Sequence, residues 1–221
     1  MRKRIIIGVM IALIIGVSGT NYFGQSLVSK SGYTYSGTTS RDKNILALNQ
    51  AMRKLWTDHM QYTYATVNAF YHNPTAVEAN LDRLLQNQKE MGAAIVPYYG
   101  KDAGDSLAAL LTTHIQQAVP VLKAAKAGDK VALDKALTDW YANADEIAVF
   151  LSKANPKNWK ESATKPMMKA HISQTTAYSV DILKGDYAQA VKDYDEAYHH
   201  MMMLADTLTD GIVKQFPKKF K

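Results

Sequence analysis

The chain has 221 residues, of which 47% are hydrophobic, with a formal net charge of +6 and no cysteine. This length suits one domain of ordinary size after an N-terminal segment, and the hydrophobic fraction is sufficient for a packed core. The lack of cysteine excludes disulfides, thiolate metal sites and cysteine nucleophiles. Residues 2–4 and 218–221 contribute six positive charges, which equals the net charge, so the body between them is near neutral and does not indicate nucleic-acid binding.

Residues 1–21 have the pattern of a secretory signal peptide or an uncleaved signal anchor. The basic residues 2–4 precede an unbroken run of apolar residues and glycine, Ile5–Val17. This run is short for a spanning helix, which needs about 20 apolar residues. Because Val17 and Gly19 offer only a partial small-residue cleavage site, we expect residues 5–20 to attach the chain to the cell membrane as a single-pass anchor helix. Cleavage would instead release a secreted protein, and in both cases the bundle would lie outside the cytoplasm.

A change of composition separates this segment from the rest of the chain. Residues 22–41 are rich in serine, glycine and threonine and carry no apolar period, which predicts a flexible stalk. Asp42 is expected to cap a long first helix over residues 43–72. The helical bundle then occupies residues 42–217. Residues 218–221 form a basic tail that we expect to be solvated, with contact to an anionic surface as the alternative.

The bundle sequence repeats one arrangement three times: a helix with a histidine, a reversal signal fourteen residues later, and a second helix. Apolar residues recur at spacings of three and four, the period of amphipathic helices. The reversal signals Asn73-Pro74, Gly128-Asp129 and Gly185-Asp186 are residue types that end one helix and cap the next. Because short connections make consecutive helices antiparallel neighbours, we predict an all-α bundle of six main helices. The three histidine-headed hairpins are expected at residues 43–97, 101–156 and 163–217.

Equivalent histidines stand in the first helix of each repeat, on or beside the apolar stripe: His59, His114 and His171. A chain that reverses after 14 or 15 residues returns to the same height after 28 or 29 residues. Buried polar groups need partners, so we expect a polar layer in which each histidine is buried and bonded to a polar group on the paired or a neighbouring helix. The residues at these offsets are Asn87, Gln88, Asn143, His199 and His200.

The layer also suggests a metal site. Neutral imidazole is a common metal ligand, and thioether sulfur near it favours a soft metal, copper first and zinc second. Two alternatives stay open: histidines that are satisfied within the core by an amide or a carbonyl, and methionines that only fill irregular core space. The candidate ligands are His59, His114, His171, His200, Met168 and Met203.

Signatures of the common enzyme classes are missing from the sequence. Glu196 and His199 form one Glu-x-x-His, whereas di-iron bundles use two of these with further carboxylates. The chain contains no phosphate-binding glycine loop, no nucleophile elbow and no zinc-protease histidine pair. We therefore name no catalytic residue.

Five strings spread over the bundle resemble a family of uncharacterised secreted or membrane-anchored prokaryotic helical proteins, over roughly residues 45–220. Members are sometimes labelled glycosyltransferase or acetylglutamate kinase, but a nucleotide-using fold should show a parallel α/β pattern and a glycine-rich loop. The resemblance therefore implies a helical fold and no activity. The strings are Leu55–His59 (LWTDH), Gly92–Gly100 (GAAIVPYYG), Trp140–Ala148 (WYANADEIA), Met203–Leu208 (MLADTL) and Gly211–Pro217 (GIVKQFP).

Three functions follow from these patterns. The first is a non-enzymatic, membrane-tethered module outside the cytoplasm that binds a small ligand or a metal ion, copper or zinc, at the polar layer. The second is a structural or interaction module whose polar layer only fixes helix register, as buried polar residues can. The third and least favoured is a metal-dependent oxidoreductase.

Overall fold

A computed structural model describes residues 39–221. The expected anchor helix at residues 5–20 and nearly all of the expected stalk lie outside the described residues. No helix in the described part of the chain is both long enough and apolar enough to cross a membrane.

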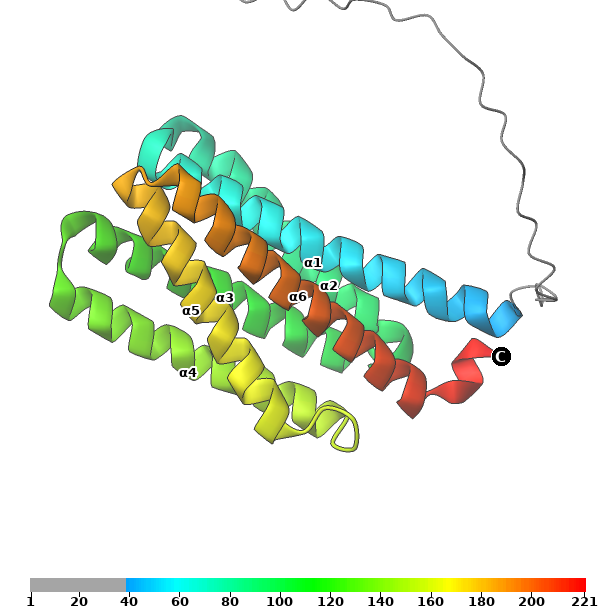
Figure 1. The fold of residues 1–221 in the computed structure, drawn as a ribbon. Helices are drawn as coiled ribbons and strands as arrows, with labels where there is room; N and C mark the ends of the chain where they lie inside the picture. Colours follow the sequence, from blue (N-terminus) through cyan, green and yellow to red (C-terminus); the bar gives the residue numbers. More distant parts are fainter. Residues whose placement is uncertain (1–38) are drawn as a thin grey trace, which may run out of the picture. The chain divides into compact units, whose positions relative to one another are not determined.

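Six long α-helices make up this part of the chain, and residues 39–221 contain no strand, which confirms the predicted all-α helical bundle (Figure 1). Two short 3-10 helices accompany them, η1 at Pro74–Ala76 and η2 at Pro217–Phe220. The long helices are α1 (Ser40–His72), α2 (Val77–Tyr99), α3 (Lys101–Ala127), α4 (Lys130–Ala154), α5 (Glu161–Lys184) and α6 (Tyr187–Gln215).

The chain reverses at the three places that the sequence predicts. Helix α1 ends at His72, directly before Asn73-Pro74. Gly128 and Gly185 follow α3 and α5 with positive φ angles of 67° and 75°, a left-handed conformation that glycine adopts without steric cost. Asp129 and Asp186 then accept hydrogen bonds from the first turns of α4 and α6. The two glycine–aspartate turns therefore both end one helix and cap the next, whereas Asn73-Pro74 ends α1 without a side-chain cap on the helix that follows.

The helices form a closed ring in chain order. Each packs against the next, and α6 packs against α1. The odd-numbered helices α1, α3 and α5 also contact one another, so they meet in the interior of the ring. Side chains on the inner faces of these three helices therefore share one core.

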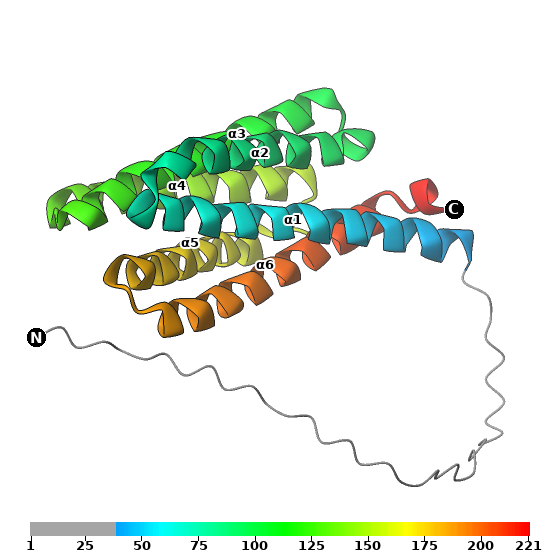
Figure 2. The ribbon, with the colours of Figure 1, turned by 90° about the horizontal axis from the view of Figure 1, so that it is seen from above.

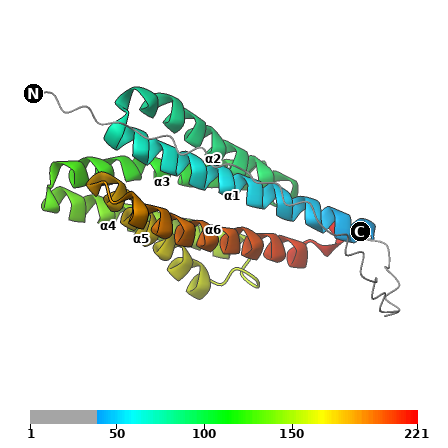
Figure 3. The ribbon, with the colours of Figure 1, turned by 45° about the horizontal axis from the view of Figure 1, so that its top comes forward.

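The ring has two ends. The loop end holds η1, Gly128 and Gly185, where the hairpins turn. The terminal end holds the start of α1, the α2–α3 and α4–α5 connections and the C-terminal segment (Figure 2 and Figure 3). The chain thus enters and leaves the bundle at the terminal end.

The first helix begins earlier than predicted. Its N-cap is Thr39, whose hydroxyl accepts from the Asp42 backbone amide at 3.2 Å, while the Asp42 carboxylate accepts from the Thr39 backbone amide at 3.1 Å. This reciprocal capping box makes Asp42 the third helical residue rather than the cap. The prediction that Asp42 is the cap is wrong, because Thr39 followed three residues later by an acidic side chain forms a capping box that satisfies two backbone amides at once.

The expectation of a solvated tail holds for Lys218, Lys219 and Lys221, which are exposed, but is wrong for Phe220. Phe220 is only 2% exposed, and its ring lies parallel to that of Tyr98 with centroids 5.8 Å apart. The Lys219 ammonium donates to the Pro97 carbonyl at 2.9 Å. Burial of one phenylalanine is worth about 1.5–3 kcal/mol, which is enough to hold η2 against the end of α2.

Helices α2 and α3 approach closely at two glycines. A Cβ atom at Gly104 would lie 2.8 Å from the Gly92 carbonyl oxygen, and one at Gly92 would overlap the Gly104 carbonyl oxygen. Both obstructing atoms are backbone, so a rotamer change cannot relieve either contact. The approach of α2 to α3 therefore requires glycine at both positions.

We expect Gly92→Ala to lower the free energy of unfolding by about 1–3 kcal/mol, because the added methyl group separates the helix backbones. Chemical denaturation measures the change. Ala93→Gly, at the exposed neighbouring residue, is the matched control and should cost about 1 kcal/mol through helix propensity alone. A stabilised Gly92→Ala variant, showing only the propensity gain, would contradict the close approach.

Candidate functional site

Three histidines meet in the middle of the bundle, one from each odd-numbered helix. His59 on α1, His114 on α3 and His171 on α5 are 2%, 1% and 2% exposed. The centroid of the His171 ring lies 5.6 Å from that of His59 and 5.7 Å from that of His114. We call His59, His114 and His171 the histidine layer. Their burial and their common height agree with the prediction from the threefold repeat.

Two tryptophans extend the layer at its sides. The Trp56 ring lies 5.6 Å from the His59 ring, and the Trp140 ring lies 5.2 Å from the His114 ring. Five aromatic rings therefore cross the core in the order Trp56, His59, His171, His114, Trp140. We did not predict the tryptophans as members of the layer. The contact of Trp56 could have been predicted from its position one helical turn before His59. The contact of Trp140 with His114 depends on how the two helices of the hairpin pack, which the sequence does not give.

The same interhelical hydrogen bond recurs in all three hairpins. A side chain on the return helix donates to the carbonyl of the residue four positions before each histidine. Each bond fixes the height of one helix against the other. The three bonds are Asn87 Nδ2 to Leu55 O (3.1 Å), Asn143 Nδ2 to Leu110 O (3.2 Å) and His200 Nε2 to Met167 O (2.8 Å).

Asn143 also determines the tautomer of His114. Its amide nitrogen donates to Leu110 O, so its Oδ1 atom is the one that lies 3.0 Å from His114 Nδ1. An amide oxygen can only accept, which places the imidazole hydrogen on Nδ1. The Nε2 atom of His114 then carries a lone pair, and this atom is buried without a hydrogen-bond partner among the described residues.

The other two histidines have weaker partners. His59 Nδ1 lies 3.4 Å from Gln88 Nε2, which donates to Leu84 O at 2.7 Å, and Gln88 Oε1 is buried without a partner among residues 39–221. The closest partner of His171 Nδ1 is Thr175 Oγ1 at 3.5 Å, on its own helix. The prediction of a partner on another helix is therefore wrong for His171, because His200 directs its ring to Met167 O instead.

All three layer histidines are held in the neutral form. Loss of solvation lowers the pKa of His59 to about 3 and that of His114 to about 4, and it lowers the pKa of His171 well below the usual value. The nearby imidazoles of the layer add repulsion against any charge on His59 or His171. Asp58, which precedes His59 in the sequence, is largely buried but pairs with Lys54 and Arg83.

Several predicted members lie elsewhere. Met203 is 47% exposed and His199 is exposed, so neither belongs to the layer. The ring of His200 donates to Met167 O, so it serves as the third-hairpin counterpart of Asn143. The predicted ligand set of six is therefore wrong as a single group, because residues on one helix three or four apart need not face the same interior point. In the described residues no group of three or more His, Asp or Glu side chains is arranged to hold a metal ion.

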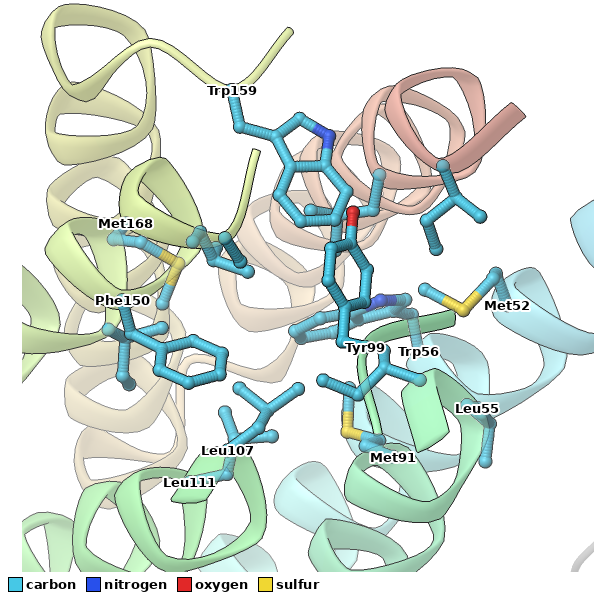
Figure 4. A pocket seen from close by; sticks show the side chains of 16 residues that line it. Met52, Leu55, Trp56, Met91, Tyr99, Leu107, Leu111, Phe150, Trp159 and Met168 are labelled. Carbon is cyan, nitrogen blue, oxygen red and sulfur yellow. The ribbon is translucent and has the colours of Figure 1, made fainter. Parts of the chain in front are cut away.

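Met168 is buried, but it faces an apolar cavity on the terminal-end side of the layer. This cavity has a volume of about 30 Å³, and Figure 4 shows Met168 and Phe150 opposite the aromatic side chains of Trp56 and Tyr99. A second cavity of about 30 Å³ reaches the layer from the loop-end side, lined by all three histidines with Thr63, Thr66 and Thr175 among its walls. The layer thus separates two small internal spaces.

Comparisons with known proteins give no relative for this chain: no family model, no curated protein and no solved structure matches it. The family resemblance inferred from the five strings therefore stays a prediction.

We predict that acid destabilises the bundle steeply. The folded state keeps these imidazoles neutral, whereas the unfolded chain takes up protons as pH falls below about 6.5. Stability is therefore complete above that pH and is lost as pH falls toward the lowered pKa values, by roughly 4 kcal/mol per pH unit at most for three histidines. Urea unfolding at a series of pH values measures the slope, and His114→Phe should remove about a third of it. A flat profile between pH 5 and 8 would show that the three histidines are not buried.

We expect Asn143→Ala to lower the free energy of unfolding by about 1–3 kcal/mol, because it removes one helix–helix hydrogen bond and leaves the Nδ1 hydrogen of His114 without an acceptor. His199→Ala, which alters an exposed histidine of the same bundle, should change stability by less than about 0.5 kcal/mol. Thermal unfolding of both variants beside the parent provides the measurement. Equal stability of the two variants would contradict the hydrogen-bond assignment.

Proposed function

We propose that the chain is a non-enzymatic helical-bundle module that binds a small ligand at the histidine layer. The observation that supports this most strongly is the Nε2 lone pair of His114, a buried acceptor with no donor in the described residues. An unsatisfied buried acceptor costs about 1–3 kcal/mol. A ligand that coordinates this nitrogen or donates to it would recover that cost, which gives the site a thermodynamic reason to be occupied.

The size of the adjoining cavity limits the ligand. A volume of about 30 Å³ holds one or two water-sized groups, because each needs roughly 10–15 Å³. An organic cofactor would not fit without expanding the core. A single metal ion or a molecule as small as water would fit. Of these two, a metal ion is the ligand that three neutral imidazoles could coordinate together.

The chemistry of the layer favours copper in its monovalent state, with zinc as the second candidate. His114 donates from Nδ1 to Asn143, the arrangement that leaves Nε2 for a metal. Nδ1 of His59 instead faces the donor Nε2 of Gln88, so a metal at Nε2 of His59 would require the Gln88 amide to turn over. The chain has no cysteine, and among residues 39–221 no Asp or Glu is buried in the core to offset a divalent charge. The rings would have to turn on binding, since the planes of His114 and His171 are only 23° apart and a metal–nitrogen bond lies in the ring plane.

The structural alternative rests on a different observation, the hydrogen bond repeated in each hairpin. Asn87, Asn143 and His200 fix the height of every return helix whether or not the layer binds anything. In this reading the polar layer selects one helix register over others, as buried polar residues do in coiled coils.

The cellular setting that we propose follows from the sequence. The basic residues 2–4 and the apolar run 5–17 support a tether in the cell membrane with the bundle outside the cytoplasm. The absence of cysteine is compatible with an oxidising compartment.

Metal titration distinguishes the two functions. Under reducing conditions the purified protein should retain one copper(I) ion against a competing chelator and should melt at a higher temperature, because a ligand that binds only the folded state stabilises it. His171→Leu should abolish retention, whereas His199→Ala should keep it. His171 is the best position because it makes no interhelical hydrogen bond, so its replacement disturbs the fold least. Failure of the parent to retain copper or zinc, or equal retention by His171→Leu, would favour the register function.

A further inference from the structure

The positive charge of the folded unit is concentrated at the terminal end. Residues 39–46, 99–105, 150–165 and 209–221 contain eleven Lys or Arg and five Asp or Glu. The corresponding segments at the loop end, residues 66–79, 121–135 and 178–192, contain six and five. The two ends of the same bundle therefore differ strongly in charge, although the whole unit is close to neutral.

The cations at the terminal end are available to a partner. Lys101 pairs with Asp105 and Lys165 pairs with Glu161, but the other nine form no ion pair within residues 39–221. Lys157 and Lys160 in the α4–α5 connection are exposed, as are Lys214, Lys218 and Lys221.

Hydrogen bonds join these segments into one surface. Gln215 on α6 donates to the Ala154 carbonyl at 3.0 Å and accepts from the Tyr99 hydroxyl at 2.7 Å. Asn155 donates to the Gly211 carbonyl at 2.9 Å. The end of α2, the α4–α5 connection and the end of α6 are thus held together, so their lysines move as one charged face rather than as separate tails.

We propose that this cationic terminal end docks the bundle onto the anionic headgroups of a lipid bilayer. Helix α1 begins at this same end, and only 22 residues, 18–39, separate it from the apolar run Ile5–Val17. A tether of that length keeps the terminal end within reach of the membrane surface. Lysines near such a surface are attracted to anionic lipid within about a Debye length, roughly 8–10 Å.

Lipid fits this face better than nucleic acid does. A nucleic-acid surface requires a basic stripe that tracks a backbone, whereas these lysines are grouped at one end of the bundle, around the point where the chain enters it. This inference rests on the proposed membrane tether, so its test must separate the two.

The test measures lysine reactivity in the full chain. The protein is placed with nanodiscs of phosphatidylcholine alone or mixed with phosphatidylglycerol, and amine labelling is followed by mass spectrometry. Lys157, Lys160 and Lys218 should label several-fold more slowly in the anionic discs, and added salt should remove the difference. Loop-end Lys130 and Lys184 should label equally in both, which makes them internal controls.

Two matched charge variants sharpen the result, each with five lysines changed to glutamine. The terminal-end variant should lose the protection of Lys153 and Lys219 in anionic discs, and the loop-end variant should retain it. Lys219 is left unchanged because it donates to the Pro97 carbonyl. The changed residues are Lys157, Lys160, Lys214, Lys218 and Lys221 in the first variant and Lys123, Lys130, Lys135, Lys184 and Lys192 in the second.

Each outcome is decisive. A chain that enters both kinds of disc but labels identically in them overturns the docking and leaves the tether standing. Binding to anionic discs alone supports the docking and refutes the tether. No association with either kind of disc refutes both. Protection by added RNA in neutral discs, without protection in anionic discs, would assign the face to nucleic acid instead.

Discussion

The interior of this bundle depends on keeping three imidazoles uncharged. An ionised side chain in a low-dielectric core is costly unless an opposite charge or several hydrogen bonds accompany it. Within residues 39–221 no buried carboxylate shares the layer with His59, His114 and His171. The neutral form is therefore the only one compatible with this packing. It follows that single hydrogen bonds, rather than ion pairs, determine the orientation of each ring. The same bonds determine which ring nitrogen carries the hydrogen.

The threefold repeat turns this constraint into an architecture. In each hairpin a return-helix side chain reaches the carbonyl four residues before the histidine, through Asn87, Asn143 or His200. The repeats nevertheless differ in the hydrogen-bond partner of the histidine itself. Asn143 bonds both to the carbonyl and to His114. Asn87 bonds to the carbonyl only, and the partner of His59 is Gln88. His200 likewise bonds to the carbonyl only, and the partner of His171 is a threonine of its own helix. His171 is thus the most weakly hydrogen-bonded of the three rings, and it lies between the other two.

The sequence was sufficient to predict what depends on local periodicity. The six helices, the three reversals and the common height of the histidines follow from residue spacing and from turn chemistry at Asn73, Gly128 and Gly185. The members of the site could not all be predicted, because spacing gives height along a helix but not the direction of a side chain. Met203 and His199 were at suitable heights but point outward, whereas Trp140 approaches His114 across the hairpin. The burial of Phe220 depends on Tyr98, a contact that no local pattern indicates.

The central claim is that the layer histidines are neutral, with the His114 hydrogen on Nδ1. Nuclear magnetic resonance of isotope-labelled histidine ring nitrogens measures both properties in the intact protein. Near pH 5 an ordinary histidine is mostly charged, but we expect His59, His114 and His171 to be uncharged, with Nδ1 of His114 protonated and its Nε2 bare. Imidazolium signals assigned to His59, His114 or His171 under those conditions, or a hydrogen on Nε2 of His114, would contradict the account.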